Sequence, residues 1–384
     1  MATTFLEPGG DGTFLLQKTT NGLAFWLDKN ATVPTIATDF VHGGHLKSIS
    51  PNTTAAGSLY SPNGIVSDAG SRISFYVYFN TLPDAATKTS IFALNKTGFG
   101  SQIVILNITS GGVLQLWNTS TAQIGSDGSH TLSTGKWYRI SLAYTITSTT
   151  VNRFELFVDG SSDISITNAT ITNTTSSQMM FGKFGATFTG DYRLSDIYVD
   201  NSASLTDTGD IWVTAKRPVS NGTTNGFSTQ IGAGGSGYGS GHSPQVNERA
   251  LSTTNGWSMV GAGSAVTEEY NIEAKNVGDI DVSTATIVAK CFWVSTSSLV
   301  GENSSIVYNG STQVQAITST PTIYTIYLTS TSYPAGTGAD IGIITDTSLT
   351  TVSLYECGVI VAYIPATGGT TFVPTPTLAF MGVG

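Results

Sequence analysis

The sequence predicts an all-β protein with two successive β-sandwiches. Charged residues make up only 11% of the 384-residue chain, whereas the β-branched and aromatic residues that favour strands, and the Gly, Asn and Ser that favour turns, are abundant. Short runs of alternating apolar and polar residues recur between turn signals. Long runs of helix-forming residues are absent from the sequence, so the pattern favours strands throughout.

The clearest strand is residues 137–144. Its side chains alternate between an apolar face with Tyr, Ile and Leu and a second face, which is the period of a half-buried strand. A second apolar run, residues 154–158, ends at Asp159-Gly160, which suits a type I′ turn because both central residues need positive φ. Residues 163–166 supply the return strand, so the sequence predicts an antiparallel sheet here.

The strands form two blocks that we expect to be separate domains. Residues 1–215 have the strand spacing of a sandwich of two antiparallel sheets. We expect residues 216–245 to be a Gly-rich linker or loop, residues 246–366 to form a second sandwich, and residues 367–384 to be a Gly/Thr/Pro tail. The best strands are residues 73–79, 91–94, 102–106, 113–117 and 193–200 in the first block, and 286–294, 323–328 and 352–364 in the second.

The net charge of the chain argues against two classes of binding partner. A formal charge of −9 and a pI near 4.8 argue against nucleic acid or an anionic membrane, since both demand clustered Lys and Arg. No apolar run approaches the roughly 20 residues of a membrane span. The start of the sequence lacks the basic residues and apolar centre of a signal peptide, so we expect synthesis in a cytoplasm and release by lysis or within a larger particle.

Three segments carry a family resemblance. Residues 135–144 hold a Trp-Tyr strand, residues 154–160 an apolar strand that ends in Asp-Gly, and residues 192–200 a closing strand with an Asp before alternating apolar residues. Together they resemble the laminin-G/pentraxin-like branch of the concanavalin-like lectin/glucanase superfamily, over about residues 65–200. The resemblance implies a concanavalin-like jelly roll, and because that fold carries lectins, glycosidases and structural modules it implies no single activity.

The arrangement along the chain is similar to that of virion structural proteins of tailed bacteriophages. A start without a signal peptide precedes a lectin-like domain, and Lys216-Arg217-Pro218 then leads through residues 245–248 to residues 268–272 and a second β domain. This resemblance implies a place on a tail, fibre or capsid surface, with other virion proteins as partners. Exposed sheet edges and symmetric particle sites favour a homo-oligomer, such as a trimer.

Catalytic motifs are missing from the sequence. Glycosidases of this superfamily carry carboxylates at alternate positions of one strand, so that acid and nucleophile share a cleft. No Glu-x-Asp-x-Glu run exists, Asp279 and Asp281 lack a third carboxylate, and Glu268 and Glu269 are adjacent. The glycines of residues 232–237 match a dinucleotide fingerprint in spacing, but the residues after them cannot start a stable helix. We therefore expect that the protein is not an enzyme and has no catalytic residue.

Two groups of side chains have the chemistry of metal ligands. His42 and His45, with Asp39 before them, are spaced so that both imidazoles turn inward, but no third His or Cys lies near. We expect no bound metal and no cofactor. The second group is acidic, and its carboxylates either supply oxygen ligands to Ca²⁺ or are simply solvated at an edge of the sheet. The members of that acidic group are Asp196, Asp200, Asp207 and Asp210.

The two cysteines, Cys291 and Cys357, lie in strand-like runs. Two cysteines do not make a disulfide scaffold. The sequence leaves both a pair of buried thiols and a single bridge between neighbouring strands open.

Aromatic residues beside glycines are the candidate ligand-binding residues. Phe99, Tyr238 and Trp257 are expected on loops, where rings stack on the apolar faces of sugars, contact a neighbouring subunit or pack locally. The aromatic residues that we expect in the core instead, because they lie within strands, are Trp137, Phe154 and Phe157.

The sequence thus predicts a non-enzymatic phage virion structural protein, displayed on the particle surface as a capsid decoration or as part of a tail or fibre. Its lectin-like domain would face outward, and no nucleic acid or membrane insertion is expected. One alternative is a receptor-binding fibre or adhesin that recognises host glycans. The other is a polysaccharide-degrading enzyme, which the missing carboxylate set disfavours.

Overall fold

The structure is a computed structural model, and every regular element in the part that it describes is a β-strand. This confirms the predicted all-β class. No helix among these residues is long and apolar enough to cross a membrane. The described residues are 3–7, 27–28, 35–42, 48–51, 58–61, 63–84, 89–96, 101–118, 122–182, 190–216, 218–232, 256–260, 264–272, 286–298, 302–308, 311–329, 341–345 and 351–364.

The first sandwich has an eight-stranded sheet and a seven-stranded sheet, both antiparallel. The larger sheet has the order β13 (Ser161–Thr167), β12 (Asn152–Val158), β11 (Trp137–Ile146), β6 (Ser71–Thr81), β15 (Asp191–Asp200), β4 (Ser48–Ser50) and β3 (Thr35–Ala37), and β1 (Thr3–Glu7) also pairs with β15. The smaller sheet has the order β10 (Ala122–Ile124), β9 (Leu114–Asn118), β8 (Gln102–Ile108), β7 (Thr89–Asn95), β14 (Gln178–Gly182), β5 (Ser58–Tyr60) and β2 (Leu27–Asp28).

The second sandwich has a six-stranded and a five-stranded sheet, which confirms the predicted second β-sandwich. Its larger sheet has the order β18 (Thr229–Ile231), β19 (Gly256–Val260), β26 (Thr351–Tyr363), β21 (Thr286–Ser297) and β24 (Thr322–Thr329), and β16 (Trp212–Lys216) also pairs with β26. Its smaller sheet has the order β17 (Pro218–Asn225), β20 (Thr267–Ile272), β25 (Ile341–Thr345), β22 (Glu302–Tyr308) and β23 (Ser311–Ile317).

The segment expected to be a linker contributes strands to the second sandwich. β17 pairs with β20, and β18 pairs with β19, so residues 218–225 and 229–231 lie within its two sheets. The glycines that suggested a linker are concentrated in residues 232–241, most of which lie outside the described residues. Thr and Asn at the start of the segment occur in loops as well as in edge strands. Composition alone therefore did not reveal β17, which is an edge strand.

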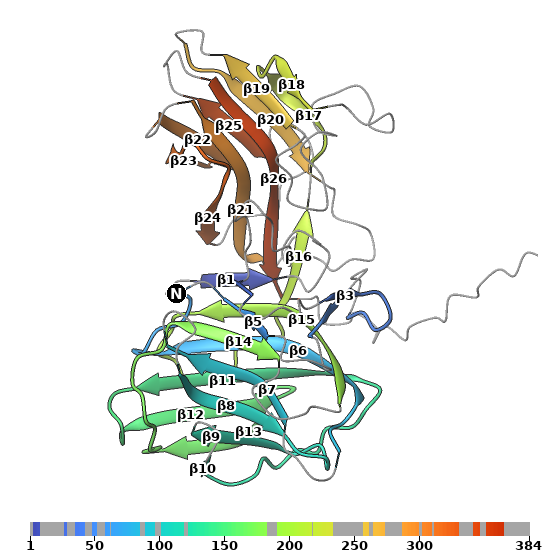
Figure 1. Cartoon of the computed structure of the whole chain (residues 1–384), viewed down its shortest axis with the longest axis vertical. Coiled ribbons are helices and arrows are strands. Elements are labelled where there is room, and N and C mark those ends of the chain that lie inside the picture. The colour runs from blue at the N-terminus through green and yellow to red at the C-terminus, as the bar shows by residue number, and fades with distance from the viewer. Residues whose placement is uncertain are drawn as a thin grey trace, which may run out of the picture.

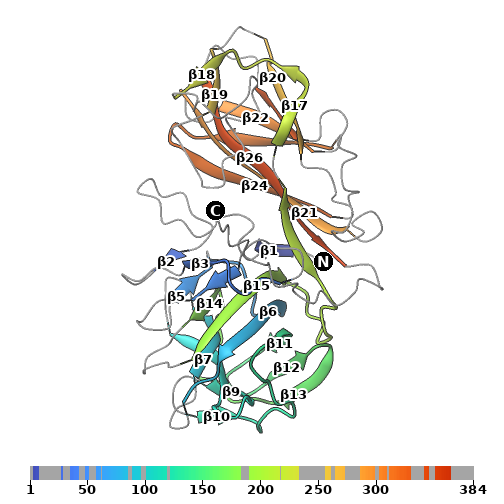
Figure 2. The same ribbon diagram turned by 90° about the vertical axis from the view of Figure 1, so that its right-hand side faces the viewer.

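The two sandwiches meet at β16, which leaves the first and runs beside β26 of the second (Figure 1, Figure 2). The apolar core of the first sandwich extends into this joint, because Ile211, Val213, Ile360 and Ala362 belong to the same buried cluster. Strand β15 of the first sandwich also lies beside β16. The joint is therefore a packed apolar contact between the two bodies.

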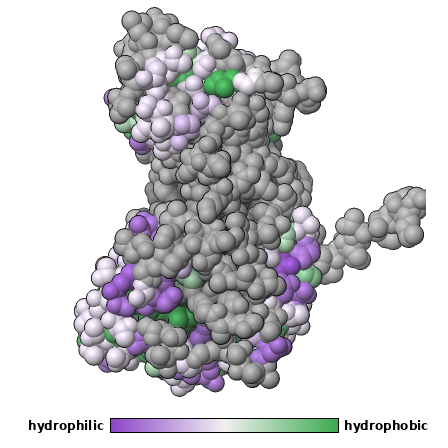
Figure 3. Space-filling model, viewed as in Figure 1, coloured by the Kyte–Doolittle hydropathy of each residue, from purple (hydrophilic) through white to green (hydrophobic). Residues whose placement is uncertain are grey.

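The surface differs between the two sandwiches. Strongly hydrophilic residues gather on the first sandwich in Figure 3, at the lower end of the view, whereas the described surface of the second is paler and includes an apolar patch. On the side seen in this view, the strongly hydrophilic residues of the described surface are therefore concentrated on the first sandwich.

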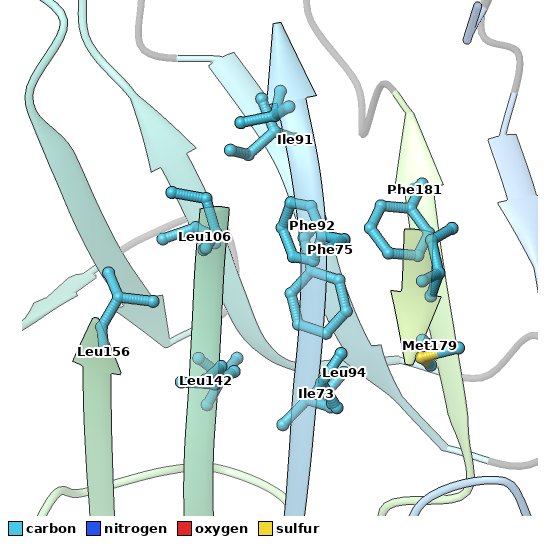
Figure 4. Packing of buried hydrophobic residues seen from close by; sticks show 14 of the residues in the cluster. Ile73, Phe75, Ile91, Phe92, Leu94, Leu106, Leu142, Leu156, Met179 and Phe181 are labelled. Atoms are coloured by element: carbon cyan, nitrogen blue, oxygen red, sulfur yellow. The ribbon is translucent and has the colours of Figure 1, made fainter. Parts of the chain in front are cut away.

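Aromatic rings fill the centre of the first sandwich. Phe75 of the larger sheet meets Phe181 of the smaller one edge to face at 5.0 Å between centroids, and Phe92 lies 5.8 Å away (Figure 4). All three side chains are fully buried, and such pairs stabilise a core beyond the area that they bury. A smaller cluster around Tyr270 and Tyr363 forms the core of the second sandwich.

The predicted alternation of residues 137–144 is confirmed. Tyr138, Ile140 and Leu142 are buried between the sheets, which leaves Trp137 and Arg139 on the outer face of the larger sheet. The turn that follows also has the expected geometry, because Asp159 (φ +49°) and Gly160 (φ +86°) both have positive φ. The same alternation in β6 and β15 decides which side chains form the outer face.

Candidate functional site

The candidate site is the outer face of the eight-stranded sheet, formed by the outward side chains of β6, β11 and β15. Two segments of the chain lie over it, residues 38–42 and residues 201–212. The indole Nε1 of Trp137 donates to the carbonyl of Val41 at 3.0 Å, and Arg139 bonds Asp207 in the second segment. Both segments are thereby fastened to the sheet by side chains that project from it.

Six rings make a continuous aromatic layer on this face. Phe40 is stacked on Tyr78 at 4.4 Å, and Tyr78 is tilted against Trp137 at 5.6 Å. The layer continues from Trp137 to His42 at 5.3 Å, and from His42 to Tyr76 at 3.8 Å and Trp212 at 4.8 Å. Its half-buried members are Phe40, Tyr78, Trp137 and Trp212, and its buried members are His42 and Tyr76.

A charged network borders the exposed end of the aromatic layer. The guanidinium of Arg193 donates to both oxygens of Asp39, at 2.6 and 3.0 Å, and also to Asp191. Asn80 donates its amide to the other oxygen of Asp191 at 3.1 Å. The guanidinium also lies 5.8 Å from the centroid of the Phe40 ring. Carboxylates, an amide and aromatic faces are thus held together in one patch.

The ionisation of this patch follows from its contacts. The hydrogen bond from Arg193 lowers the pKa of Asp39, so this carboxylate stays charged in mildly acidic solution. Burial, together with the negative charge of Asp39, raises the pKa of Tyr78. Tyr78 therefore presents a neutral hydroxyl beside an ionised carboxylate.

The opposite end of the face is more deeply buried. Arg139 and Asp207 form a bidentate pair at 2.6 and 2.9 Å. Burial alone would lower the pKa of Arg139 and raise that of Asp207. The hydrogen bond and opposite charge of the partner outweigh burial in each residue, so the pKa of Arg139 is raised and that of Asp207 is lowered. Tyr76 donates its hydroxyl to Asp210, and burial followed by the charge of Asp210 raises the pKa of Tyr76 strongly.

Asp196 ties the face to the joint between the sandwiches. Its carboxylate is fully buried and accepts hydrogen bonds from the Nδ1 of His42 at 2.7 Å and from the Oγ of Ser195 at 2.8 Å. Its second oxygen accepts the backbone N–H of Val213 in β16 at 2.7 Å. Asp196 itself has φ +50°, at an irregularity in the pairing of β15 with β6. One carboxylate thus fixes the aromatic layer and the connecting strand together.

The arrangement is suited to binding a hydroxyl-rich ligand. Half-buried rings offer flat apolar faces, and the bordering carboxylates and amide accept and donate hydrogen bonds at fixed positions. His42, Tyr76 and Asp210 are also groups of the kind that transfer protons in catalysis.

Of the three predicted ligand-binding residues, only one lies in the described part of the chain. Phe99 and Tyr238 lie outside it. Trp257 lies in β19, opposite Gln230 and Leu354, and its half-buried ring packs against the second core. Its expected place on a loop is therefore corrected, because the glycine before it begins a strand. Its role in ligand binding remains a prediction.

Two further expectations about single residues are also corrected. Trp137 was expected in the core with Phe154, which is buried there, but Trp137 and Phe157 point outward and are half-buried. The alternation of β11 already assigned Trp137 to the face of Arg139, and that signal outweighs the general preference of Trp for cores. The matching pattern in β6, with Tyr76 and Tyr78, could have identified the aromatic layer.

Each carboxylate of the acidic group that was considered for Ca²⁺ is bonded to another side chain. Asp200 is buried against Arg72 at 2.8 Å, and the other three carboxylates bond Arg139, His42 or Tyr76. No group of three or more potential metal ligands occurs among the described residues. His45 lies outside them. Cys357 carries a buried thiol, and the side chain of Cys291 is not among those described.

Comparisons with known proteins concern the fold. No family model matches the chain, and no curated protein sequence matches it. Solved structures match with low identity, and those named below are carbohydrate-active β-sandwich proteins. An endo-β-1,4-glucuronan lyase from Trichoderma reesei has a TM-score of 0.38 and 15% identity, over 54% of this chain and 98% of that one.

Two other matches illustrate the range of these neighbours. Domain 4 of a GH43 extracellular arabinanase from Geobacillus stearothermophilus, solved with arabinotriose, has a TM-score of 0.35 and 16% identity, over 52% of this chain and 93% of that domain. A Trypanosoma rangeli sialidase has a TM-score of 0.33 and 14% identity, over 47% of this chain and 31% of the sialidase. A phage origin has no counterpart among these named neighbours.

These comparisons correct the expectation that the chain is not an enzyme. The matching structures include a glucuronan lyase, sialidases and an alginate lyase, all of which are enzymes. The missing Glu-x-Asp-x-Glu run excluded one arrangement of catalytic carboxylates and not catalysis in general. No residue role is transferred from these neighbours, because the likeness concerns the fold alone.

Proposed function

We propose that the protein binds carbohydrate on the outer face of the eight-stranded sheet. The observation that carries this proposal is the half-buried run of Phe40, Tyr78 and Trp137 beside the bonded network of Asp39, Arg193 and Asp191. A pyranose ring has an apolar C–H face and a rim of hydroxyls. It therefore suits an aromatic surface bordered by carboxylates.

The network is preorganised, which favours binding. Arg193 holds two carboxylates at once, and Asn80 holds the second of them from the other side. Because these side chains are ordered before a ligand arrives, less conformational entropy is lost on binding. The bond from Trp137 to Val41 orders the segment that bears Phe40 in the same way.

The test is saccharide binding by the full chain, measured on a glycan array and then by calorimetry. Trp137→Ala and Tyr78→Ala each remove one ring of the face, and we expect about tenfold weaker binding from each, or roughly 1.4 kcal/mol. Trp117→Ala is the matched control, since Trp117 is a half-buried indole on β9 in the other sheet. Unchanged affinity in Trp137→Ala, or no saccharide bound by a folded chain, would refute the proposal.

The same experiment addresses catalysis. Incubating the chain with each bound polysaccharide and assaying new reducing or unsaturated ends tests whether the face also cleaves its ligand. Tyr76→Phe and His42→Gln are the informative variants, because both groups lie in the aromatic layer. Cleavage that disappears in these variants, while binding persists, would make the face a catalytic site.

We propose, as a second function, that the second sandwich attaches the protein to a virion surface as a decoration or fibre component. The observation that favours a partner there is apolar exposure on both edge strands of the five-stranded sheet, with Val219 in β17 at 55% and Val314 in β23 at 69%. The partners would be other virion proteins or further copies of the chain. Mass spectrometry of washed particles tests this, and absence from the particles would count against it.

A further inference from the structure

We infer that the outer face selects neutral saccharides over acidic ones. This inference rests on the proposed carbohydrate-binding function and adds the chemical class of the ligand. Its basis is the distribution of charge on the part of the face formed by β6, β11, β15 and the two segments over them, where carboxylates outnumber guanidinium groups and are also more exposed.

Each guanidinium that projects from β6, β11 or β15 is already bonded to a carboxylate. Arg72 bonds Asp200, Arg139 bonds Asp207, and Arg193 bonds Asp39 and Asp191. The arginine side chains are only 11%, 8% and 9% exposed, respectively. The carboxylate of an acidic sugar would have to displace one of these internal partners to reach a cation.

Around the aromatic layer, on the part of the face formed by β6, β11 and β15, the exposed charges are negative instead. The exposed Arg153 lies on the neighbouring strand β12 and pairs with Glu155. The side chain of Asp39 is 46% exposed and that of Asp191 is 29% exposed, and both border the half-buried rings. Asp210 is exposed beside Trp212 and accepts its indole N–H at 2.9 Å. An acidic sugar that stacked on Tyr78 or Trp137 would therefore meet like charge at its rim.

The charge balance of the part formed by β6, β11, β15 and the two segments over them points the same way. Six carboxylates face three guanidinium groups there, which gives a balance of −3 when the imidazole is not counted. Arg193 and Arg139 lower the pKa values of Asp39 and Asp207, so these carboxylates keep their charge well below neutral pH. The six are Asp39, Asp191, Asp196, Asp200, Asp207 and Asp210, and the three are Arg72, Arg139 and Arg193.

A neutral saccharide fits the same groups without this conflict. Two neighbouring hydroxyls donate to one carboxylate, and the two exposed carboxylates held by Arg193 can each receive such a pair. The hydroxyl of Tyr78, which its raised pKa keeps protonated, adds a donor for a ring or hydroxyl oxygen. The rings then cover the apolar face of the sugar.

The experiment compares two ligand classes with the full chain at about 20 mM and about 300 mM salt. The probes are neutral gluco-, arabino- and manno-oligosaccharides, and acidic oligoglucuronate and sialyllactose. We expect the best neutral probe to bind at least about tenfold more tightly than any acidic one, with little change across the salt range because a neutral ligand is not screened. Tighter binding of an acidic probe would overturn the inference.

A charge variant gives a second, independent readout. The double change Asp39→Asn and Asp191→Asn keeps the shape of the patch, removes two negative charges and releases Arg193. We expect acidic probes to bind this variant within about threefold of the neutral ones. Asp127→Asn is the control, because Asp127 is an exposed carboxylate beside Gln115 and Gln123 on the other sheet. An acidic probe that still binds at least about tenfold more weakly than the neutral ones would contradict the inference.

The proposed carbohydrate site and the inferred class of ligand can be refuted separately. If no probe of any class binds a folded chain, or if binding survives Trp137→Ala unchanged, the proposed function itself is wrong. If saccharides bind through Trp137 but the acidic class is preferred, the carbohydrate site stands and only the inferred class is wrong. Asp191→Asn alone, which retains the pair of Arg193 with Asp39, repeats the test should the double variant not fold.

Discussion

The two sandwiches of this chain share one architecture but use polar groups differently. Every ion pair found among the described residues lies in the first sandwich, and most of these pairs lie on or beside the outer face of its larger sheet. The second sandwich is held by apolar alternation and strand pairing, with a smaller buried cluster. Because apolar residues could stabilise a sheet at least as well as ion pairs on its outer face, the concentration of these pairs on one face supports the binding function that we propose for it.

The two sandwiches also differ in what their buried carboxylates connect. Asp196 in the first sandwich and Glu268 in the second are both fully buried, and each accepts a backbone N–H, from Val213 and from Phe227 respectively. Glu268 bonds a residue of its own sandwich, and burial together with its charge raises the pKa of Tyr270 well above its usual value. Asp196 instead connects its own sandwich to the strand that enters the other one.

We expect the largest effect from removing the carboxylate of Asp196. Asp196→Ala leaves His42 and the N–H of Val213 without their acceptor in a buried site, which costs about 3–5 kcal/mol of unfolding free energy. Asp196→Asn should cost less, because Asn tolerates positive φ and keeps an oxygen. Urea denaturation measures both, with Asp127→Asn as the exposed control. Equal stability of Asp196→Ala and the parent chain would show that the joint does not depend on this carboxylate.

A somewhat smaller effect is expected at Trp212. Its ring packs against the second core and lies tilted against His42, so it connects both bodies. Because the ring is half-buried, Trp212→Ala should cost about 2 kcal/mol, near half the loss from a fully buried aromatic residue.

The same change should weaken saccharide binding, while Trp212→Phe should preserve most of both properties. Calorimetry of unfolding and of binding on the same samples checks this pair. A loss of stability without any loss of binding would separate the joint from the site.

The fold of the molecule could be predicted well from the sequence, but the candidate site on the outer face could not. Alternation in residues 137–144 and the Asp159-Gly160 turn set the sheet, because period and turn chemistry are local properties. The site depends on contacts such as that between Asp39 and Arg193, which are 154 residues apart. Glycine neighbours suggested loops for Trp257, but strand pairing with β26 outweighed that local signal.

We expect acidification to destabilise the first sandwich by protonating Asp207. Arg139 holds the folded-state pKa of Asp207 below its unfolded value, so the stabilisation is complete above the unfolded value and is lost as the pH falls through the folded one. Asp207→Asn should cost about 1.5 kcal/mol at pH 7, the scale of one charged hydrogen bond, and nothing further on acidification from this pair. Unfolding curves between pH 7 and pH 3 measure the difference. A parallel decline in both proteins would exclude this pair as a source of the acid sensitivity.

The smallest expected effect on stability is at the exposed edge of the second sandwich. Val314 in β23 is 69% exposed, so Val314→Lys should change the unfolding free energy by less than about 0.5 kcal/mol. Lys on an edge strand opposes pairing with another chain, so the same change should shift an oligomer that forms through this edge toward monomer. Light scattering during gel filtration measures the mass, and Val151→Lys in the first sandwich, at 51% exposure, is the matched control. An unchanged oligomer in Val314→Lys would place the subunit contact elsewhere, and a shift in Val151→Lys alone would move it to the sandwich that we propose binds saccharide.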